Sequence, residues 1–213
     1  MAHPARTMAD NVPEPELLAQ LLQASARRHR HLCPRQVLGV RLGLRGLRAL
    51  GFVSAAGLPR FHNEEKQLLT IVETDGCGAD GVAVATACAV GRRTLRVLDY
   101  GKVAATLVDT ASGRTVRVHP SPQSRQLARR YAPGARSRWH AYLQAYQVIP
   151  DEALLVVQEV RLTQSLAAIL SKPEARACCA RCGEEILNER EVVQGDRVLC
   201  RHCAGDHYYE LAR

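Results

Sequence analysis

Apolar residues in the first quarter of the chain recur at helical spacing. They predict a helix from residue 15 to about residue 30, with an apolar face formed by Leu17, Leu18, Leu21 and Leu22. A second helix is predicted from Pro34, which suits a first helical turn, to Leu50, because Gly51 follows as a stop signal. The chain therefore opens with two helices.

The second predicted helix has two unusual stripes. Gly39, Gly43 and Gly46 share one face, and the other stripe consists of Arg41, Arg45 and Arg48. Each glycine costs a helix about 1 kcal/mol relative to alanine. We therefore expect a sheet or another helix to pack very close to the glycine face.

The middle of the chain alternates short apolar runs with turn residues. A strand over 68–74 and the turn Asp75-Gly76 lead into a helix of small residues over 78–90. Short links then join strands at 95–98, 103–108 and 114–118, which is typical of an antiparallel meander. Further helices are predicted at 122–131 and 135–146, and a last strand at 153–162. The pattern predicts an α+β domain with helices packed on an antiparallel sheet.

The domain organisation follows from changes in composition. We expect a flexible leader over 1–14, the α+β domain over 15–165, a linker over 166–173 and a cysteine-rich module over 174–213. The first 15 residues have no apolar core typical of a secretory signal, and the apolar stretch 81–91 is too short to span a bilayer. We therefore expect a cytoplasmic protein with no membrane contact.

The C-terminal module contains two Cys-x-x-Cys pairs separated by seventeen residues: Cys179, Cys182, Cys200 and Cys203. This spacing is typical of a structural zinc site in which four thiolates close the coordination sphere. About forty residues bury too little core to fold alone, so the metal would supply the folding free energy. Cys178 is an alternative to Cys179 as a ligand.

The formal net charge of +8 invites a nucleic-acid interpretation, but its distribution does not favour one. The cysteine-rich module has six arginines against eight carboxylates, so the positive excess lies in residues 1–173. Aromatic residues make up only 4% of the chain, which leaves little material for base stacking. We interpret the excess as a solvated arginine surface.

Three further cysteines lie in the α+β domain. Cys33 and Cys77 each directly precede a predicted helix, where free amides favour the thiolate and lower a thiol's pKa. His29 and His31 stand just before Cys33, and Asp80 follows Cys77 by three residues. The hypothesis is a second site that holds a transition metal, with His31, Cys33 and Cys77 as ligands and Asp80 as a fourth ligand or an acceptor behind them. Cys88 would lie about 16 Å from Cys77 along one helix, too far to share that metal.

These motifs together resemble the FmdE family, which takes its name from formylmethanofuran dehydrogenase. The resemblance rests on His29-Arg-His-Leu-Cys33-Pro34, Glu73-Thr-Asp-Gly-Cys77-Gly-Ala-Asp80, Cys88 with Gly91, Asp99-Tyr-Gly101-Lys102 and the terminal cysteines. It implies an α+β domain followed by a treble-clef-like zinc finger, a homodimer, and a polar cavity near Cys33 and Cys77.

The chain also departs from the family's pattern. The family has glycine where this chain has Arg35, and Gly-Cys-Thr-x-Gly-Lys where this chain has Ala87-Cys88-Ala89-Val90-Gly91-Arg92. The family loop would hold an anionic group through its threonine and lysine, so the resemblance leaves Arg92, together with Lys102, as the residues to bind a cofactor. Arg92 offers bidentate donors in place of the lysine's point charge.

The leading functional hypothesis is a metal-binding protein that supports a molybdenum or tungsten enzyme, which would be its partner. One alternative is a thiol-dependent enzyme with Cys33 or Cys77 as nucleophile and His31 as base. The other is a regulator that uses its zinc finger to contact protein or nucleic acid, and the acidic module makes nucleic acid the weakest of these interpretations.

Overall fold

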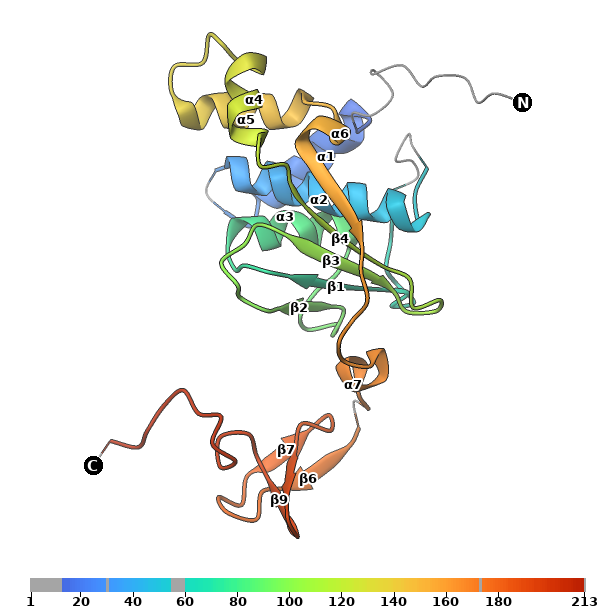
Figure 1. Cartoon of the computed structure of the whole chain (residues 1–213), viewed down its shortest axis with the longest axis vertical. Helices are drawn as coiled ribbons and strands as arrows, with labels where there is room; N and C mark the ends of the chain where they lie inside the picture. Colours follow the sequence, from blue (N-terminus) through green and yellow to red (C-terminus); the bar gives the residue numbers. More distant parts are fainter. Residues whose placement is uncertain (1–12, 30, 55–59, 173, 213) are drawn as a thin grey trace. The chain divides into compact units, whose positions relative to one another are not determined.

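A computed structural model describes residues 13–29, 31–54, 60–172 and 174–212. The chain divides into two compact units, with the division between Leu162 and Thr163 (Figure 1). Most of the predicted leader, residues 1–12, lies outside the described residues. Within the described ranges, no helix combines the length and the apolar character needed to cross a membrane.

The first unit contains six helices and five strands among its described residues. The helices are α1 (Pro15–Ala26), α2 (Pro34–Leu50), α3 (Cys77–Thr86), α4 (Ser124–Tyr131), α5 (Arg138–Val148) and α6 (Asp151–Leu154). The strands are β1 (Leu68–Val72), β2 (Leu95–Val97), β3 (Ala105–Asp109), β4 (Thr115–Pro120) and β5 (Leu155–Glu159).

The five strands form one sheet in the order β2-β1-β3-β4-β5. The pairs β1–β3, β3–β4 and β4–β5 are antiparallel, with Thr70 opposite Leu107 and Val118 opposite Val157. The pair β1–β2 is parallel, because α3 carries the chain back across the sheet between these two strands. The α+β class is thus confirmed, with a mixed sheet in place of the wholly antiparallel one predicted.

The second helix has the predicted bounds. Pro34 opens it, the Gln36 side chain accepts a hydrogen bond of 2.8 Å from the Cys33 backbone N–H, and Gly51 ends it with a positive φ of 84°. The helix packs against β3, β4 and β5 on the sheet and against α1, α3 and α5 (Figure 1). It is the central element of the first unit.

The glycine face of α2 is where α3 approaches. A Cβ atom at Gly39 would lie 2.2 Å from the carbonyl oxygen of Gly78, and one at Gly81 would lie 2.4 Å from that of Gln36. A Cβ atom at Gly46 would lie 2.6 Å from the Leu107 side chain of β3. The expectation of close packing is confirmed, and both a helix and the sheet supply it. The approach brings the amino-terminal turns of α2 and α3 together.

The arginine stripe of α2 is not a solvated surface. Arg41 is fully buried; it donates to Asp151 Oδ1 at 2.7 Å and to the carbonyl oxygens of Tyr146 and Ile149 at 2.7 and 2.6 Å. Arg48 donates to Asp151 Oδ2 at 2.9 Å. The strand predicted over 153–162 begins only at Leu155, because residues 151–154 form α6. The first residue of α6 is Asp151, which carries the buried carboxylate.

The second unit contains the short helix α7 (Leu166–Leu170), which lies in the predicted linker, and two small hairpins. One hairpin pairs β6 (Arg176–Cys178) with β7 (Glu185–Leu187), and the other pairs β8 (Val192–Gln194) with β9 (Arg197–Leu199). Only three residues form its buried cluster: Cys179, Ile186 and Leu199. Among the described residues this unit has no core comparable to that of the first.

Candidate metal and thiol sites

The first Cys-x-x-Cys pair lies in the loop between β6 and β7, and the second directly follows β9. In the first pair, Gly183 donates to the Cys179 carbonyl at 2.9 Å and has a φ of 77°, which turns the chain after Cys182. The Ala180 N–H donates to the Val198 carbonyl at 2.8 Å and so fixes the first knuckle against the strand before the second. Backbone hydrogen bonds thus bring the two pairs to one place.

The four sulfur atoms form a potential metal site. Those of Cys179, Cys182, Cys200 and Cys203 all lie within 4.8 Å of one another, and within the described ranges no other group of three or more His, Cys, Asp or Glu side chains converges in this way. Four thiolates with no other donor give a closed tetrahedral set, which suits a structural zinc ion. Cys179, and not the exposed Cys178, belongs to this group.

The electrostatics of this cluster favour a cation. Hydrogen bonds from the backbone N–H groups of Cys182 and Cys200 lower the pKa of the Cys179 thiol to about 6. Burial and the neighbouring Cys200 side chain raise the pKa of Cys203 to about 12. Ionisation of one thiol disfavours ionisation of its neighbours, because the resulting negative charges repel one another. A divalent cation among the four sulfur atoms offsets this repulsion.

In the first unit, the close approach of α2 and α3 brings Cys33 and Cys77 together. Cys33 caps α2, and Cys77 is the first residue of α3. Both thiols are partly buried, and they lie close enough for Cys33 to raise the pKa of Cys77. Arg35, two residues after Cys33, and Gly78, which directly follows Cys77, also lie near one another. The predicted convergence of the two cysteines therefore occurs.

The expected activation of the thiols does not hold for Cys77. Burial raises the pKa of its thiol, and the contact with Cys33 and the negative charge of Asp80 raise it further. These effects outweigh the helix terminus, because a neighbouring thiol and a carboxylate both oppose formation of an anion. A neutral thiol is a poor nucleophile, so Cys77 alone does not fit the thiol-enzyme alternative.

The histidines near this site have different partners. His29 Nε2 lies 2.6 Å from Asp80 Oδ2, and Arg28 Nη1 lies 3.5 Å from Asp80 Oδ1. The ring of His31 lies 6.4 Å from that of Trp139 on α5. Both histidines precede Cys33 in the sequence, and we predicted His31 as the ligand. The local sequence contains no signal that decides which of the two histidines faces Asp80.

The other predicted residues have partners outside the thiol pair. Cys88 is buried, and its sulfur accepts hydrogen bonds from Asn63 Nδ2 at 3.3 Å and Thr70 Oγ1 at 3.4 Å, so it belongs to the core. Arg92 donates to the carbonyl oxygens of Asn63 and Glu64, both at 2.8 Å. Lys102 is exposed and, after Arg117, contributes to the lowered pKa of Glu73.

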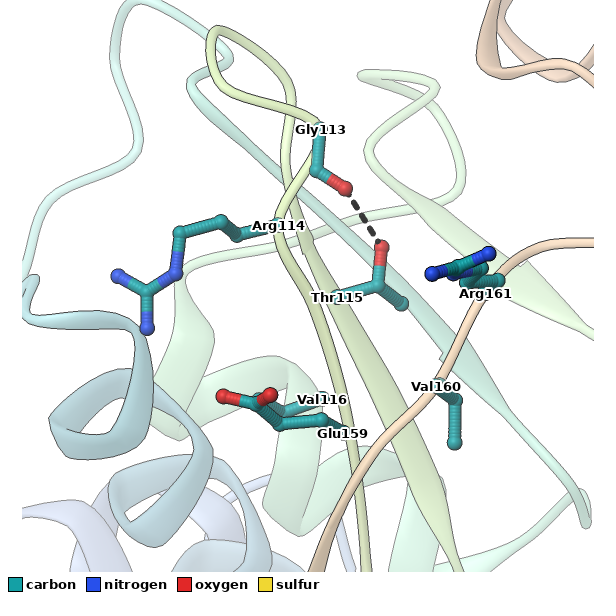
Figure 2. A pocket seen from close by; sticks show the side chains of 7 residues that line it. All are labelled: Gly113, Arg114, Thr115, Val116, Glu159, Val160 and Arg161. Carbon is teal, nitrogen blue, oxygen red and sulfur yellow. Dashed lines mark hydrogen bonds between the residues drawn. The ribbon is translucent and has the colours of Figure 1, made fainter.

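A cavity of about 410 Å³ opens elsewhere in the first unit, beside β4 and the end of β5. Figure 2 shows the residues that line it, including Arg114, Glu159 and Arg161, with Thr115 Oγ1 donating to the Gly113 carbonyl at 3.0 Å. The lining charges are mixed, and none of the predicted site residues contributes to it. This cavity is therefore separate from the thiol pair.

Fold and site together define a two-part protein, in which an α+β domain with two convergent cysteines is joined to a four-cysteine finger. Residues 28–175 match the family described as "FmdE, Molybdenum formylmethanofuran dehydrogenase operon". Residues 173–209 match the "Prokaryotic dksA/traR C4-type zinc finger". The chain belongs to the FmdE family and carries a C4-type zinc finger at its C-terminal end.

Two relatives extend the comparison. A protein named "Probable S-adenosyl-L-methionine-binding protein" from Archaeoglobus fulgidus is 29% identical over an alignment of 216 positions, which covers 92% of this chain and 56% of that protein. The chain thus spans little more than half the length of that relative. The crystal structure of a "tungsten formylmethanofuran dehydrogenase subunit e (FmdE)-like protein" from Syntrophus aciditrophicus matches with a TM-score of 0.56 and 20% identity, over 91% of this chain and 95% of that one. At that identity the likeness concerns the fold alone.

Proposed function

We propose that this FmdE-family protein is a cytoplasmic, homodimeric metal-binding protein that supports a molybdenum or tungsten enzyme. In this proposal the C-terminal finger holds a structural zinc ion, and the convergent ends of α2 and α3 hold a second transition metal or a cofactor. The observation that carries the second site is the close approach of the N-termini of α2 and α3, which carry Cys33 and Cys77. The link to molybdenum or tungsten rests on the names of the family and of its relatives.

The zinc assignment is supported by the donor set and by the size of the second unit. Four sulfur atoms within 4.8 Å of one another match the donors that zinc prefers in structural sites. Because the unit buries only a three-residue cluster, the free energy of metal binding has to replace a hydrophobic core. No position is left for substrate in such a closed site, so its role is to hold the fold.

The second site is supported by the chemistry of its donor groups. Thiolate is a ligand for soft and borderline transition metals, and a bound cation would reverse the raised pKa of Cys77 by stabilising the anion. His31 and Asp80 complete the ligand set in this proposal. Asp80 already contacts His29, so a shift of the loop before Cys33 would have to bring His31 to the metal, or His29 would take its place.

S-adenosylmethionine is a second candidate ligand for the same site, suggested by the name of the Archaeoglobus relative. The observation in its favour is the partly exposed Asp80 carboxylate, which suits the cationic sulfonium and ammonium groups, and the exposed Trp139 ring beside His31, which suits the adenine. Calorimetric titration of the metal-loaded protein with S-adenosylmethionine tests this candidate, and Asp80→Asn should abolish the heat of binding.

Metal analysis of the purified protein tests the main proposal. We expect two equivalents of metal per chain in the wild type, one in the Cys33→Ala/Cys77→Ala variant, and two in the matched control Cys178→Ala, because Cys178 lies outside the four-sulfur group. The folded state of each variant is checked by circular dichroism. One equivalent in the wild type that persists in the double variant would rule out the second metal.

A further inference from the structure

A long stretch of the first unit lacks acidic residues. Between Asp109 and Asp151 the chain contains seven arginines and no aspartate or glutamate. Six of these arginines are exposed. One of them, Arg114, directly precedes β4, and the other five lie on α4, on α5 or on the loop that joins them: Arg125, Arg129, Arg130, Arg136 and Arg138. We refer to these five residues as the arginine hairpin. In Figure 1, α4 and α5 lie beyond α2 on the side of the first unit away from the sheet.

The arginine hairpin has no carboxylate partner within the part of the chain that the structure describes. None of the ion pairs in that part includes any of its five members, and Arg136 Nε instead donates to His140 Nε2 at 2.7 Å. Other arginines of the same unit are neutralised: Arg41 pairs with Asp151, and Arg117 with Glu73 at 2.5 Å. Five arginines without a carboxylate partner in the described part of the chain therefore lie together on one helical hairpin.

The packing of α4 directs this charge to solvent. Ser124 and Ala128 are buried one turn apart and define the inner face of the helix. Arg125 and Arg129 are also one turn apart, about 100° around the helix from that face. Guanidinium groups on this outer face are free to pair bidentately with phosphate oxygens.

Two exposed aromatic rings lie within the same hairpin. Tyr131 ends α4 with 43% of its surface exposed, and Trp139 at the start of α5 has 41% exposed. Two of the chain's few aromatic residues therefore lie on the same hairpin as the exposed arginines. Exposed rings next to unpaired arginines are the combination that binds single-stranded nucleic acid, since phosphates pair with guanidinium groups and bases stack on rings.

We propose that the arginine hairpin, with Tyr131 and Trp139, binds single-stranded nucleic acid. Charge selects a polyanion, and the two rings favour one that also presents flat apolar faces. An acidic protein surface offers the charge without those faces, and a duplex keeps its base faces stacked inside. The five arginines and Tyr131 have no role in the proposed metal site, whereas Trp139 lies beside His31. Variants of the arginines and of Tyr131 therefore test this inference separately from the proposed metal function.

The chain provides its own probe, because Trp139 is its only tryptophan. Titration of the full-length protein with an oligothymidylate should quench the tryptophan fluorescence as a base stacks on the ring. Binding should weaken with salt, since log K falls by about 0.7 for each phosphate contact per unit of log salt concentration. Arg129→Ala/Arg130→Ala should lower that slope by about 1.4. Tyr131→Ala should weaken binding about tenfold at fixed salt.

Matched controls distinguish this surface from general electrostatic attraction. Arg197→Ala removes an exposed arginine of the zinc-finger unit and should leave both the quenching and the salt slope unchanged. Polyglutamate of equal charge should not quench Trp139. Equal quenching by polyglutamate would overturn the proposal in favour of an acidic protein partner. Absence of salt-dependent binding, or equal loss in the Arg197→Ala control, would also overturn it.

Discussion

The two units of this protein are held together by different physical means. The first buries a continuous cluster of aliphatic residues between α1, α2, α3 and a five-stranded sheet. Among its described residues, the second buries a cluster of only Cys179, Ile186 and Leu199, two of which lie beside or within the four-sulfur group. A domain of this smaller size cannot bury enough apolar surface to offset its chain entropy, so a metal site takes over that role. The stability of each unit should therefore respond to a different perturbation.

Removal of zinc has the largest expected effect, and it should be confined to the second unit. Apparent binding free energies of structural zinc are about 10–16 kcal/mol, so chelation should unfold the finger. Limited proteolysis after treatment with a strong chelator should cut within residues 163–213 and leave the first unit intact. If both units became sensitive to protease together, the stability of the first unit would also depend on the metal, which contradicts the comparison.

Loss of the buried ion pair should have the next largest effect, in the first unit. Asp151→Asn leaves the fully buried Arg41 and the nearly buried Arg48 without a charged partner. Removing one partner of a buried pair costs about 3–5 kcal/mol of unfolding free energy. Urea denaturation measures the loss, and the exposed neighbour provides the control, since Glu152→Gln should change it by less than about 0.5 kcal/mol. Equal losses in the two variants would show that the pair is not the cause.

A methyl group at the α2–α3 contact should have the smallest effect of the three. In Gly39→Ala the new Cβ would lie 2.2 Å from the Gly78 carbonyl oxygen, so the two helices must move apart. Overpacking of this kind costs about 1–3 kcal/mol. Thermal unfolding of Gly39→Ala should be compared with Gly91→Ala, where nothing lies within 4 Å of the added atom. Displacement of the helix should also increase iodoacetamide labelling of Cys33 and Cys77. Unchanged labelling would show that the close packing of α2 and α3 does not determine how accessible the two cysteines are.

Local signals predicted several elements closely. Pro34 and Gly51 determine both ends of α2, because one favours the first turn and the other accepts a positive φ. The glycine face predicted a close neighbour, and the spacing of the terminal cysteines predicted the four-sulfur group. In each case the signal lies within a few residues of the feature, and local backbone chemistry decides it.

Other features could not be predicted because they depend on residues far apart in the chain. The helix expected over 78–90 ends at Thr86, where Ala87 takes a positive φ of 50° and Cys88 turns into the core. The arginines of α2 form one stripe in sequence, yet Arg41 is buried by a carboxylate 110 residues away. Periodicity describes which residues share a face, but it contains no information on what covers that face.

The sequence by itself determined the division into a helical and sheet domain and a cysteine-rich finger, the family to which the chain belongs, and the four sulfur ligands, since composition and short spacings encode all of these. Only the tertiary structure decided which chemical groups meet in the first unit. It brought Cys33 to Cys77 and His29 to Asp80, placed His31 beside Trp139, and left the arginine hairpin unpaired. The reason is that the glycine face of α2 allows α3 to approach closely, which brings the N-termini of the two helices together. This approach follows from packing over the whole unit.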